Sequence, residues 1–196
     1  MGKGKKLVYG VGDTGGLTVT VNGKKIKAYN TWKCMLERCY SESRLERHPS
    51  YIGCEVSEEW KYYPNFLKFY EDNYREGYQL DKDLLIQNNK IYSKETCRFV
   101  PQTINLLILQ RTADRGQLPI GVNYKRGSKR PYQVRIRVLG KSKYIGIFST
   151  PEEAFYAYKE FKEAHVKEVA EGFYKRGEIC EAVYNALMKW EVNIDD

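Results

Sequence analysis

The chain has 196 residues and a formal net charge of +8, from 33 Lys and Arg against 25 Asp and Glu, and this length suits one domain or two small ones. No stretch approaches the about 18 apolar residues of a membrane-spanning helix, and the first residues, Met1 to Lys6, lack the apolar run of a signal peptide. We therefore expect neither a membrane-spanning nor an exported protein, but a cytoplasmic one.

The first quarter of the chain predicts a hairpin followed by a helix. Two short strands flank a Gly-rich loop over 7–21, and Asn22-Gly23 predicts a tight turn into a strand at 24–28. Asn30 or Thr31 is expected to cap a helix. The apolar residues at helical spacing along it are Trp32, Met35, Leu36 and Cys39.

A series of short elements is expected between residues 41 and 107. A polar loop over 41–49 leads to a strand at 52–56, and helices are expected to start near 57 and 64. A strand at 79–85, a helical turn at 92–97 and an extended piece at 98–100 follow. Pro101 is then expected at the first position of a helix. The polar segment 110–119 is the best linker, so we expect one module over 1–110 and a linker at 111–118.

The most informative stretch runs from Arg115 to Thr150, where Lys and Arg are frequent and Asp and Glu are absent. Residues 111–150 carry ten Lys and Arg against one acid, whereas residues 151–196 carry six against eleven. Three strands are expected near 120–125, 131–139 and 142–148. In the middle strand polar residues alternate with apolar ones, which puts cations on one face of the sheet. Such a face suits a polyanion.

Two helices are expected after the sheet. Thr150-Pro151-Glu152-Glu153 is a strong helix start, with Thr150 as N-cap and Glu153 closing a capping box. A final helix is expected over 178–190, and its acidic surroundings make a protein partner conceivable. The apolar stripe expected to cover the sheet consists of Ala154, Tyr158, Phe161, His165 and Val169.

The segment from Ile120 to Ala170 resembles the APETALA2/ethylene-response-factor DNA-binding domain. The resemblance rests on Gly121-Val122, Tyr132 to Arg137, Tyr144 to Thr150, Glu152 to Ala154 and Ala157-Tyr158. It implies a three-stranded antiparallel sheet that enters the DNA major groove, with a helix packed behind it, in a domain over 119–172. A C-terminal helix over 173–196 would follow.

The resemblance also implies which residues contact DNA. Those at the family's contact positions are Asn123, Lys125, Arg137, Ser142 and Tyr144. This chain departs from the family pattern because Ile120, Asn123 and Ser142 stand where the family has Arg, and Tyr144 where it has Trp. Binding to phosphates needs only charge, and the residues expected to supply it are Lys125, Arg126, Lys129, Arg130, Arg135 and Arg137.

The first half resembles phage HNH-type proteins related to homing endonucleases. The series that carries this resemblance includes Trp32, Met35-Leu36, Arg38 to Tyr40, His48-Pro49, Leu80 to Asp83, Asn89, Tyr92-Ser93 and Glu95 to Val100. The fold expected for the whole chain is therefore α+β, with a degenerate ββα-metal (HNH-like) module before the three-stranded sheet.

An HNH site places an imidazole base beside a divalent metal, Mg²⁺ or Mn²⁺, on a strand–turn–helix. The resemblance matches Asp81 to the metal-binding Asp, Lys82 to the base His, Thr96 to the central Asn and Asn105 to the helix ligand. Lys is a poor general base between two aspartates, because they favour its charged form. Lys82 could instead contact phosphate, or pair with Asp81 and Asp83.

A second constellation suits a structural zinc ion. The set consists of Cys39, His48, Cys54 and Cys97, whose donor types Zn²⁺ accepts. No Cys-x-x-Cys pair is present, and free cysteines are often small core residues. A zinc site and buried thiols are therefore the two alternatives.

The sequence thus predicts a DNA-binding protein of phage or mobile-element origin, in a bacterial host cell if a phage encodes it. A metal-dependent, homing-type DNA endonuclease is one alternative. A protein-interaction module is another, and charge alone leaves RNA open as the ligand.

Overall fold

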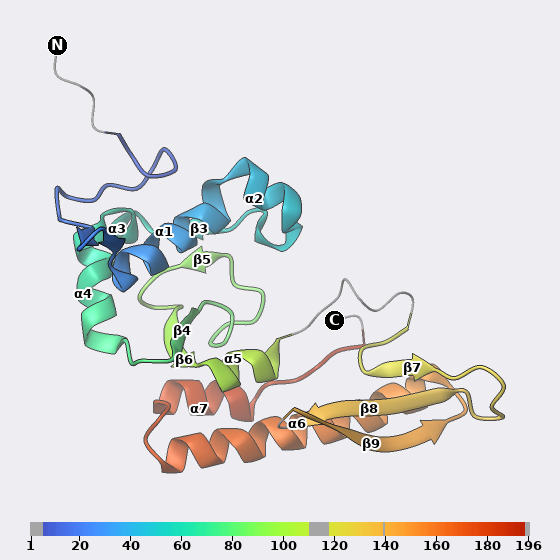
Figure 1. The fold of residues 1–196 in the computed structure, drawn as a ribbon. Coiled ribbons are helices and arrows are strands. Elements are labelled where there is room, and N and C mark those ends of the chain that lie inside the picture. Colours follow the sequence, from blue (N-terminus) through green and yellow to red (C-terminus); the bar gives the residue numbers. More distant parts are fainter. Residues whose placement is uncertain (1–5, 110–117, 139, 195–196) are drawn as a thin grey trace. The chain divides into compact units, whose positions relative to one another are not determined.

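The computed structural model describes residues 6–109, 118–138 and 140–194, so the predicted linker at 111–118 lies outside the described residues except for Leu118. The protein is of mixed α+β structure and divides into two compact units, Met1–Gln102 and Thr103–Asp196 (Figure 1). The boundary falls at the start of helix α5 (Gln102–Ile108).

The first unit combines four α-helices with pairs of very short strands. Its helices are α1 (Lys27–Tyr40), α2 (Glu42–Arg47), α3 (Glu58–Lys61) and α4 (Tyr63–Asn73), with a 3-10 turn at Pro49–Tyr51. The antiparallel pairs are β1 (Thr20–Val21) with β2 (Lys24–Lys25), and β4 (Tyr78–Asp81) with β6 (Arg98–Pro101); β3 (Glu55–Val56) pairs in parallel with β5 (Ile91–Tyr92). Helix α5 follows β6 directly.

The tight turn at Asn22-Gly23 is confirmed, with φ of 50° and 74° at its two residues, as a two-residue hairpin turn requires. The predicted hairpin over 7–21 is wrong, because its first arm folds back on itself in an isolated bridge from Val8 to Gly12, and Asp13 forms another with Tyr62. A Cβ at Gly12 would lie 2.4 Å from Leu36 Cδ1. The backbone at Gly12 therefore packs closely against α1.

Two further expectations for the first unit need correction. Helix α1 begins at Lys27, before the predicted caps, because Asn30 N–H already donates to Ile26 O at 3.0 Å. The predicted polar loop at 41–49 contains α2, in which the Leu45 N–H donates to Ser41 O and Arg47 Nε donates to Ser43 O. The backbone forms this turn of helix without an apolar stripe, so apolar spacing gave no signal for it.

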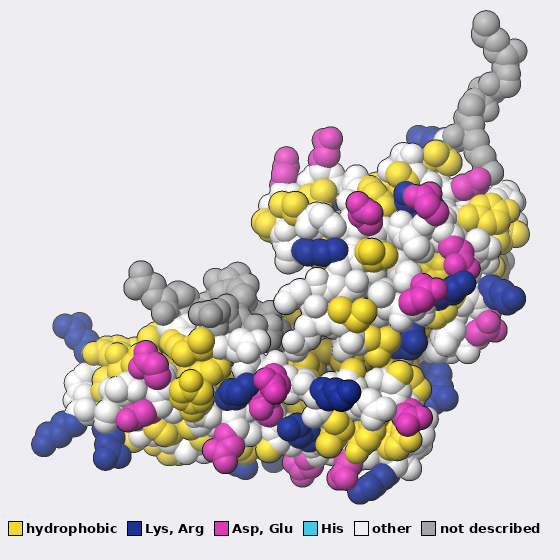
Figure 2. All heavy atoms as spheres, turned by 180° about the vertical axis from the view of Figure 1, so that it is seen from behind, with side chains coloured by type: hydrophobic (Ala, Val, Ile, Leu, Met, Phe, Trp, Pro, Cys, Tyr) yellow, Lys and Arg dark blue, Asp and Glu magenta, His cyan; other side chains and the backbone are white. Residues whose placement is uncertain are grey.

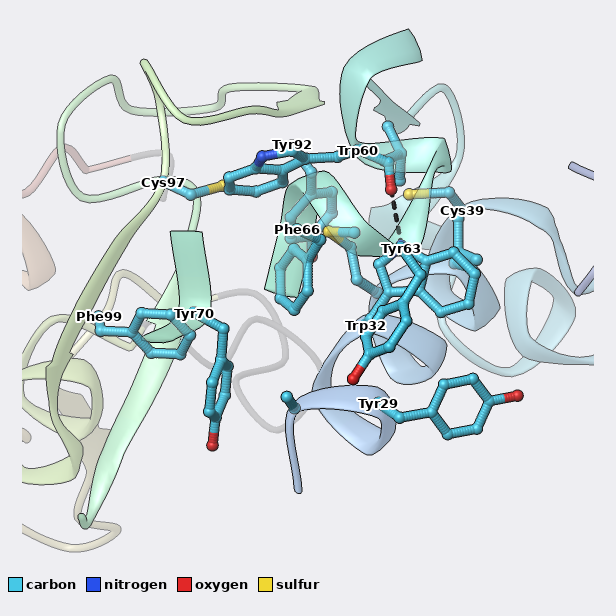
Figure 3. Close-up of a cluster of buried hydrophobic side chains, with 14 of the residues drawn as sticks. Tyr29, Trp32, Cys39, Trp60, Tyr63, Phe66, Tyr70, Tyr92, Cys97 and Phe99 are labelled. Atoms are coloured by element: carbon cyan, nitrogen blue, oxygen red, sulfur yellow. Dashed lines mark hydrogen bonds between the residues drawn. The ribbon is translucent and has the colours of Figure 1, made fainter. Parts of the chain in front are cut away.

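Aromatic side chains form the core of the first unit (Figure 3). Trp32 of α1 is fully buried, and its Nε1 donates a hydrogen bond of 2.6 Å to Trp60 O. The Trp32 ring also packs against Tyr63 of α4, with centroids 5.1 Å apart. The predicted apolar face of α1 is confirmed, since Trp32, Met35, Leu36 and Cys39 are all buried.

The second unit is a three-stranded antiparallel sheet packed on a helix, as predicted. Its strands are β7 (Val122–Tyr124), β8 (Tyr132–Val138) and β9 (Lys141–Phe148), in the order β7-β8-β9. Helix α6 (Pro151–Lys175) covers one face of this sheet, and α7 (Glu181–Met188) packs against α6 (Figure 1).

Thr150 caps α6 as predicted. Its side chain accepts a hydrogen bond of 3.1 Å from the Glu153 N–H, while the Glu153 carboxylate accepts one of 3.0 Å from Ser149 N–H. The predicted stripe is right for Ala154 and Tyr158 only. Beyond them the buried positions are Val166 and Ala170, because the second half of α6 faces α7. The remaining predicted stripe residues, Phe161, His165 and Val169, are half-buried.

Within the described ranges, no helix combines the length and apolar character needed to cross a membrane.

Candidate nucleic-acid interface

One face of the β7–β9 sheet points away from α6, and we call it the outer face. The strand register arranges its side chains in three rows across the sheet. The first row is Asn123, Gln133 and Ile147; the second is Arg135 and Tyr144; the third is Arg137 and Ser142. Most of these side chains are exposed, whereas Val134 and Ile136, which alternate with them along β8, are buried.

A β-bulge in β9 determines which side chains of this strand lie on the outer face. Val134 pairs with Gly146, but the next residue, Arg135, pairs with Tyr144, so Ile145 is extra. The bulge reverses which positions of β9 point outward. Ile147 therefore shares a face with Tyr144, three positions earlier, instead of with Ile145.

Arg135 is held in the middle of the outer face by two neighbours. Its Nε donates a hydrogen bond of 3.2 Å to Gln133 Oε1, and its guanidinium carbon lies 5.6 Å from the centre of the Tyr144 ring. Arginine commonly stacks on an aromatic face in this way. The remaining guanidinium nitrogens keep the planar fork that suits bidentate recognition.

Four exposed cations lie in the turn between β7 and β8. The turn is closed by a 2.7 Å hydrogen bond from Lys125 N–H to Pro131 O, and the Ser128 hydroxyl donates one of 2.8 Å to Arg130 O. Gly127 supplies the left-handed conformation, with φ of +82°. The four cations, which we call the basic turn, are Lys125, Arg126, Lys129 and Arg130, and all are exposed.

Lys143 also belongs to the basic stretch, but it points toward α6. It pairs with Ile136 in the register, and its Nζ lies 4.4 Å from the centre of the Phe161 ring of α6. Lys143 is therefore not part of the outer face. On the face that Figure 2 shows, acidic and basic side chains are interspersed.

The structure brings the nine predicted DNA-binding residues into two adjoining groups. Asn123, Arg135, Arg137, Ser142 and Tyr144 are on the outer face, and the other four form the basic turn. The sequence reasoning missed Gln133 and Ile147. Gln133 could have been found from the alternation in β8, whereas Ile147 depends on the bulge.

The three residues predicted to be catalytic are divided between the two units. Asp81, at the end of β4, and Lys82 lie in the first unit, whereas Asn105 lies half-buried on α5 within the second. Asp81 Oδ1 accepts hydrogen bonds of 2.8 and 2.7 Å from the N–H groups of Asp83 and Leu84. Burial raises the pKa of Asp81, against the lowering effect of these two bonds.

Lys82 is buried, with 7% of its surface exposed. Its ammonium pairs with the carboxylate of Asp83 and donates a hydrogen bond of 2.6 Å to Asn89 O. In return, Asn89 Nδ2 donates to Lys82 O at 2.8 Å. The alternative in which Lys82 pairs with a neighbouring aspartate is therefore confirmed for Asp83.

Thr96, matched to the central Asn of the HNH pattern, has a local structural role. Its hydroxyl donates a hydrogen bond of 2.7 Å to Ile91 O, and it also lies 3.2 Å from the Ser93 hydroxyl. These bonds close the turn between β5 and β6.

The predicted zinc set does not form a site. Among the described residues no group of three or more His, Cys, Asp and Glu side chains is placed to hold a metal. Cys39, Cys54 and Cys97 are buried thiols, while His48 is exposed. Burial raises the pKa of both Cys39 and Cys97 to about 12, which disfavours the thiolate that zinc binds.

Comparison of the chain with protein-family models, with curated proteins and with solved structures finds no significant match. The two resemblances described above therefore rest on the residues of this chain alone.

Proposed function

We propose that the second unit binds duplex DNA, with the outer face of the sheet against the bases and the basic turn against phosphates. The observation that supports this most directly is the pairing of an exposed sheet face, which carries Arg135 and Arg137, with four adjoining exposed cations. The sequence from Arg115 to Thr150 contains no acidic residue to oppose them. Phosphate contacts by Lys and Arg supply most of the sequence-independent affinity for DNA.

The test is fluorescence anisotropy with a labelled duplex at several salt concentrations. For B-DNA the logarithm of the binding constant falls by about 0.9 per phosphate contact for each unit of log salt concentration. Replacing Lys125 and Arg126 by Ala should lower this slope by up to about 1.8 and weaken binding.

The matched control for the loss of two positive charges is Lys167→Ala with Lys175→Ala, on α6. It should leave both affinity and slope nearly unchanged. Absence of duplex binding at low salt would refute the proposal. Tighter binding to duplex RNA or to a single strand than to duplex DNA would assign the surface to that ligand instead.

Hydrolysis of DNA by the first unit is not part of this function. The order β4, β6, α5, with Asp81 ending β4, supports a relation to ββα-metal elements. The Nζ of Lys82, however, is already engaged with the carboxylate of Asp83 and the carbonyl of Asn89, so its contacts are those of a structural side chain.

An assay for nicking of supercoiled plasmid in the presence of Mg²⁺ or Mn²⁺ tests for DNA hydrolysis by the protein. We expect no nicking above that seen with Asp81→Ala. Nicking that depends on Asp81 would establish the endonuclease alternative.

A further inference from the structure

We propose that the outer face reads DNA sequence with a fixed polarity, recognising an A·T pair at the first row and guanine at the second and third. This inference rests on the proposed function. It goes further because it assigns a base to each row of the sheet and makes Asn123, Ile147, Arg135 and Arg137 the residues that determine specificity.

The first row carries the side chains suited to an A·T pair. Asn123 is exposed on β7 and is paired with Gln133, which is paired with Ile147. An Asn or Gln amide matches the N6 and N7 edge of adenine in the major groove, and an apolar group matches the thymine methyl. Ile147 is 40% exposed, so its side chain is accessible to a thymine methyl group.

The second and third rows carry the side chains suited to guanine. Arg135 is fixed by Gln133 and Tyr144, and Arg137 is exposed next to the small side chain of Ser142. Bidentate hydrogen bonds from Arg to guanine O6 and N7 are the commonest specific contact in the major groove. An arginine already held by its neighbours loses less conformational entropy when it makes such a contact.

The spacing of the rows fits the spacing of base pairs. Residues two apart on a strand are separated by about 6.6 Å, which is about two base-pair steps of about 3.4 Å. If β8 follows the groove, the first and third rows lie about four base pairs apart. The preferred site is therefore an A·T pair with guanine about two to four base pairs away on one side.

The experiment is selection of full-length protein on a duplex library with a randomised centre, followed by anisotropy titration of the selected and mismatched duplexes. We expect enrichment of an A·T pair and of guanine at this separation. Changing either element of the selected site should weaken binding about tenfold, since one good bidentate contact discriminates by about 1–3 kcal/mol.

Variants assign each preference to its row. Asn123→Ala and Ile147→Ala should relax the preference at the A·T position only. Arg135→Ala should relax it only for guanine about two base pairs away, and Arg137→Ala only for guanine about four base pairs away. Lys125→Ala, in the basic turn, is the control: it should weaken binding to all duplexes equally and leave the preference intact. Thermal unfolding of each variant tests whether the sheet is still folded.

The outcomes separate this inference from the function on which it rests. Duplex binding without base preference would overturn the inference and leave DNA binding in place. A preference that persists in Asn123→Ala, Ile147→Ala and Arg137→Ala would also overturn it. Failure of wild-type protein to bind any duplex would overturn both.

Discussion

Lys82 stands where the HNH pattern has its base His, and in the structure it is a buried cation paired with Asp83. It lies between Asp81 and Asp83, a local sequence typical of a surface turn, yet it is buried because Asn89 folds back over it. The cation thus connects the end of β4 to the loop that precedes β5.

Replacing Lys82 by Met should lower the free energy of unfolding by about 1–3 kcal/mol, because Asn89 O loses its buried donor and Asp83 its partner. Lys94→Met is the matched control, since the Lys94–Glu59 pair is exposed and such pairs contribute under about 1 kcal/mol. Urea unfolding measures both. Equal effects would show that the contacts of buried Lys82 contribute no more to stability than the exposed Lys94–Glu59 pair.

The stability of the first unit should depend on the ionisation of Asp81. Its pKa is raised above the ordinary value of 3.8 by burial, so the folded protein holds this proton more tightly than the unfolded chain. Stability therefore falls as pH rises from 3.8 through the raised pKa, and the penalty is complete above it.

Asp81→Asn should remove this penalty, because an amide oxygen can still accept the two backbone hydrogen bonds. We expect greater stability at neutral pH and a flatter profile between pH 4 and 7 in urea unfolding. The same substitution at the exposed Asp72 controls for the loss of one charge. Destabilisation at neutral pH in Asp81→Asn would contradict this account.

At the level of elements, the contact between β7 and α6 depends on a glycine. Gly121 has φ of +78°, and a Cβ there would lie 2.1 Å from the Tyr158 ring. Gly140 has the same φ, but a Cβ there would meet nothing within 4 Å. Substitutions at these two positions therefore distinguish the energetic cost of backbone strain from the cost of steric overlap.

Gly140→Ala should therefore cost only the strain of the left-handed conformation, about 1–2 kcal/mol. Gly121→Ala should cost about 1–3 kcal/mol more, because Tyr158 must move away from the helix–sheet interface. Thermal unfolding of the two variants gives the comparison. Equal melting temperatures would show that the Tyr158 ring can move aside without loss of stability.

The sheet of the second unit was predictable because its signal is local. The alternation of Arg135 and Arg137 with Val134 and Ile136 needs only a strand with one buried face. The bulge at Ile145 depends on the pairing of β8 with β9, and no pattern within β9 reveals it. Helix α2 was missed because it lacks an apolar stripe.

In the candidate site, too, only the features with a local sequence signal could be predicted. The residues expected to contact DNA lie on one face and one turn, since they were placed by strand alternation and by charge. The role of Lys82 depends on the loop that brings back Asn89, seven residues later, and the burial of the cysteines depends on segments distant in sequence. The residue types of the cysteines suggested a zinc site, which the described residues do not form.

At the level of the whole molecule, the second unit includes part of the chain that precedes the predicted linker. Lys162 of α6 is largely buried, and its Nζ donates a hydrogen bond of 2.6 Å to Leu107 O in α5. Burial lowers the pKa of Lys162. A fragment that begins at the predicted domain start, residue 119, would leave this amine without its carbonyl partner.

A fragment of residues 103–196 should accordingly be more stable than one of residues 119–196, by about 1–3 kcal/mol. Lys162→Met should reduce the difference in stability between the two fragments, because an apolar side chain at this position needs no hydrogen-bond partner. Chemical unfolding of the two fragments with and without this substitution tests the prediction. Equal stability of the two unsubstituted fragments would show that α5 contributes nothing.

The bulge in β9 has a consequence for the curvature of the sheet. Deleting Ile145 would give a regular ladder in which Gly146 and its new neighbour Tyr144 still face Val134 and Arg135, so every outward side chain would be kept. The strand would lose the additional twist that a bulge introduces. A protein without Ile145 should then bind DNA with unchanged base preference but lower affinity, and selection with titration would reveal whether the surface recognises the shape of the groove separately from its chemistry.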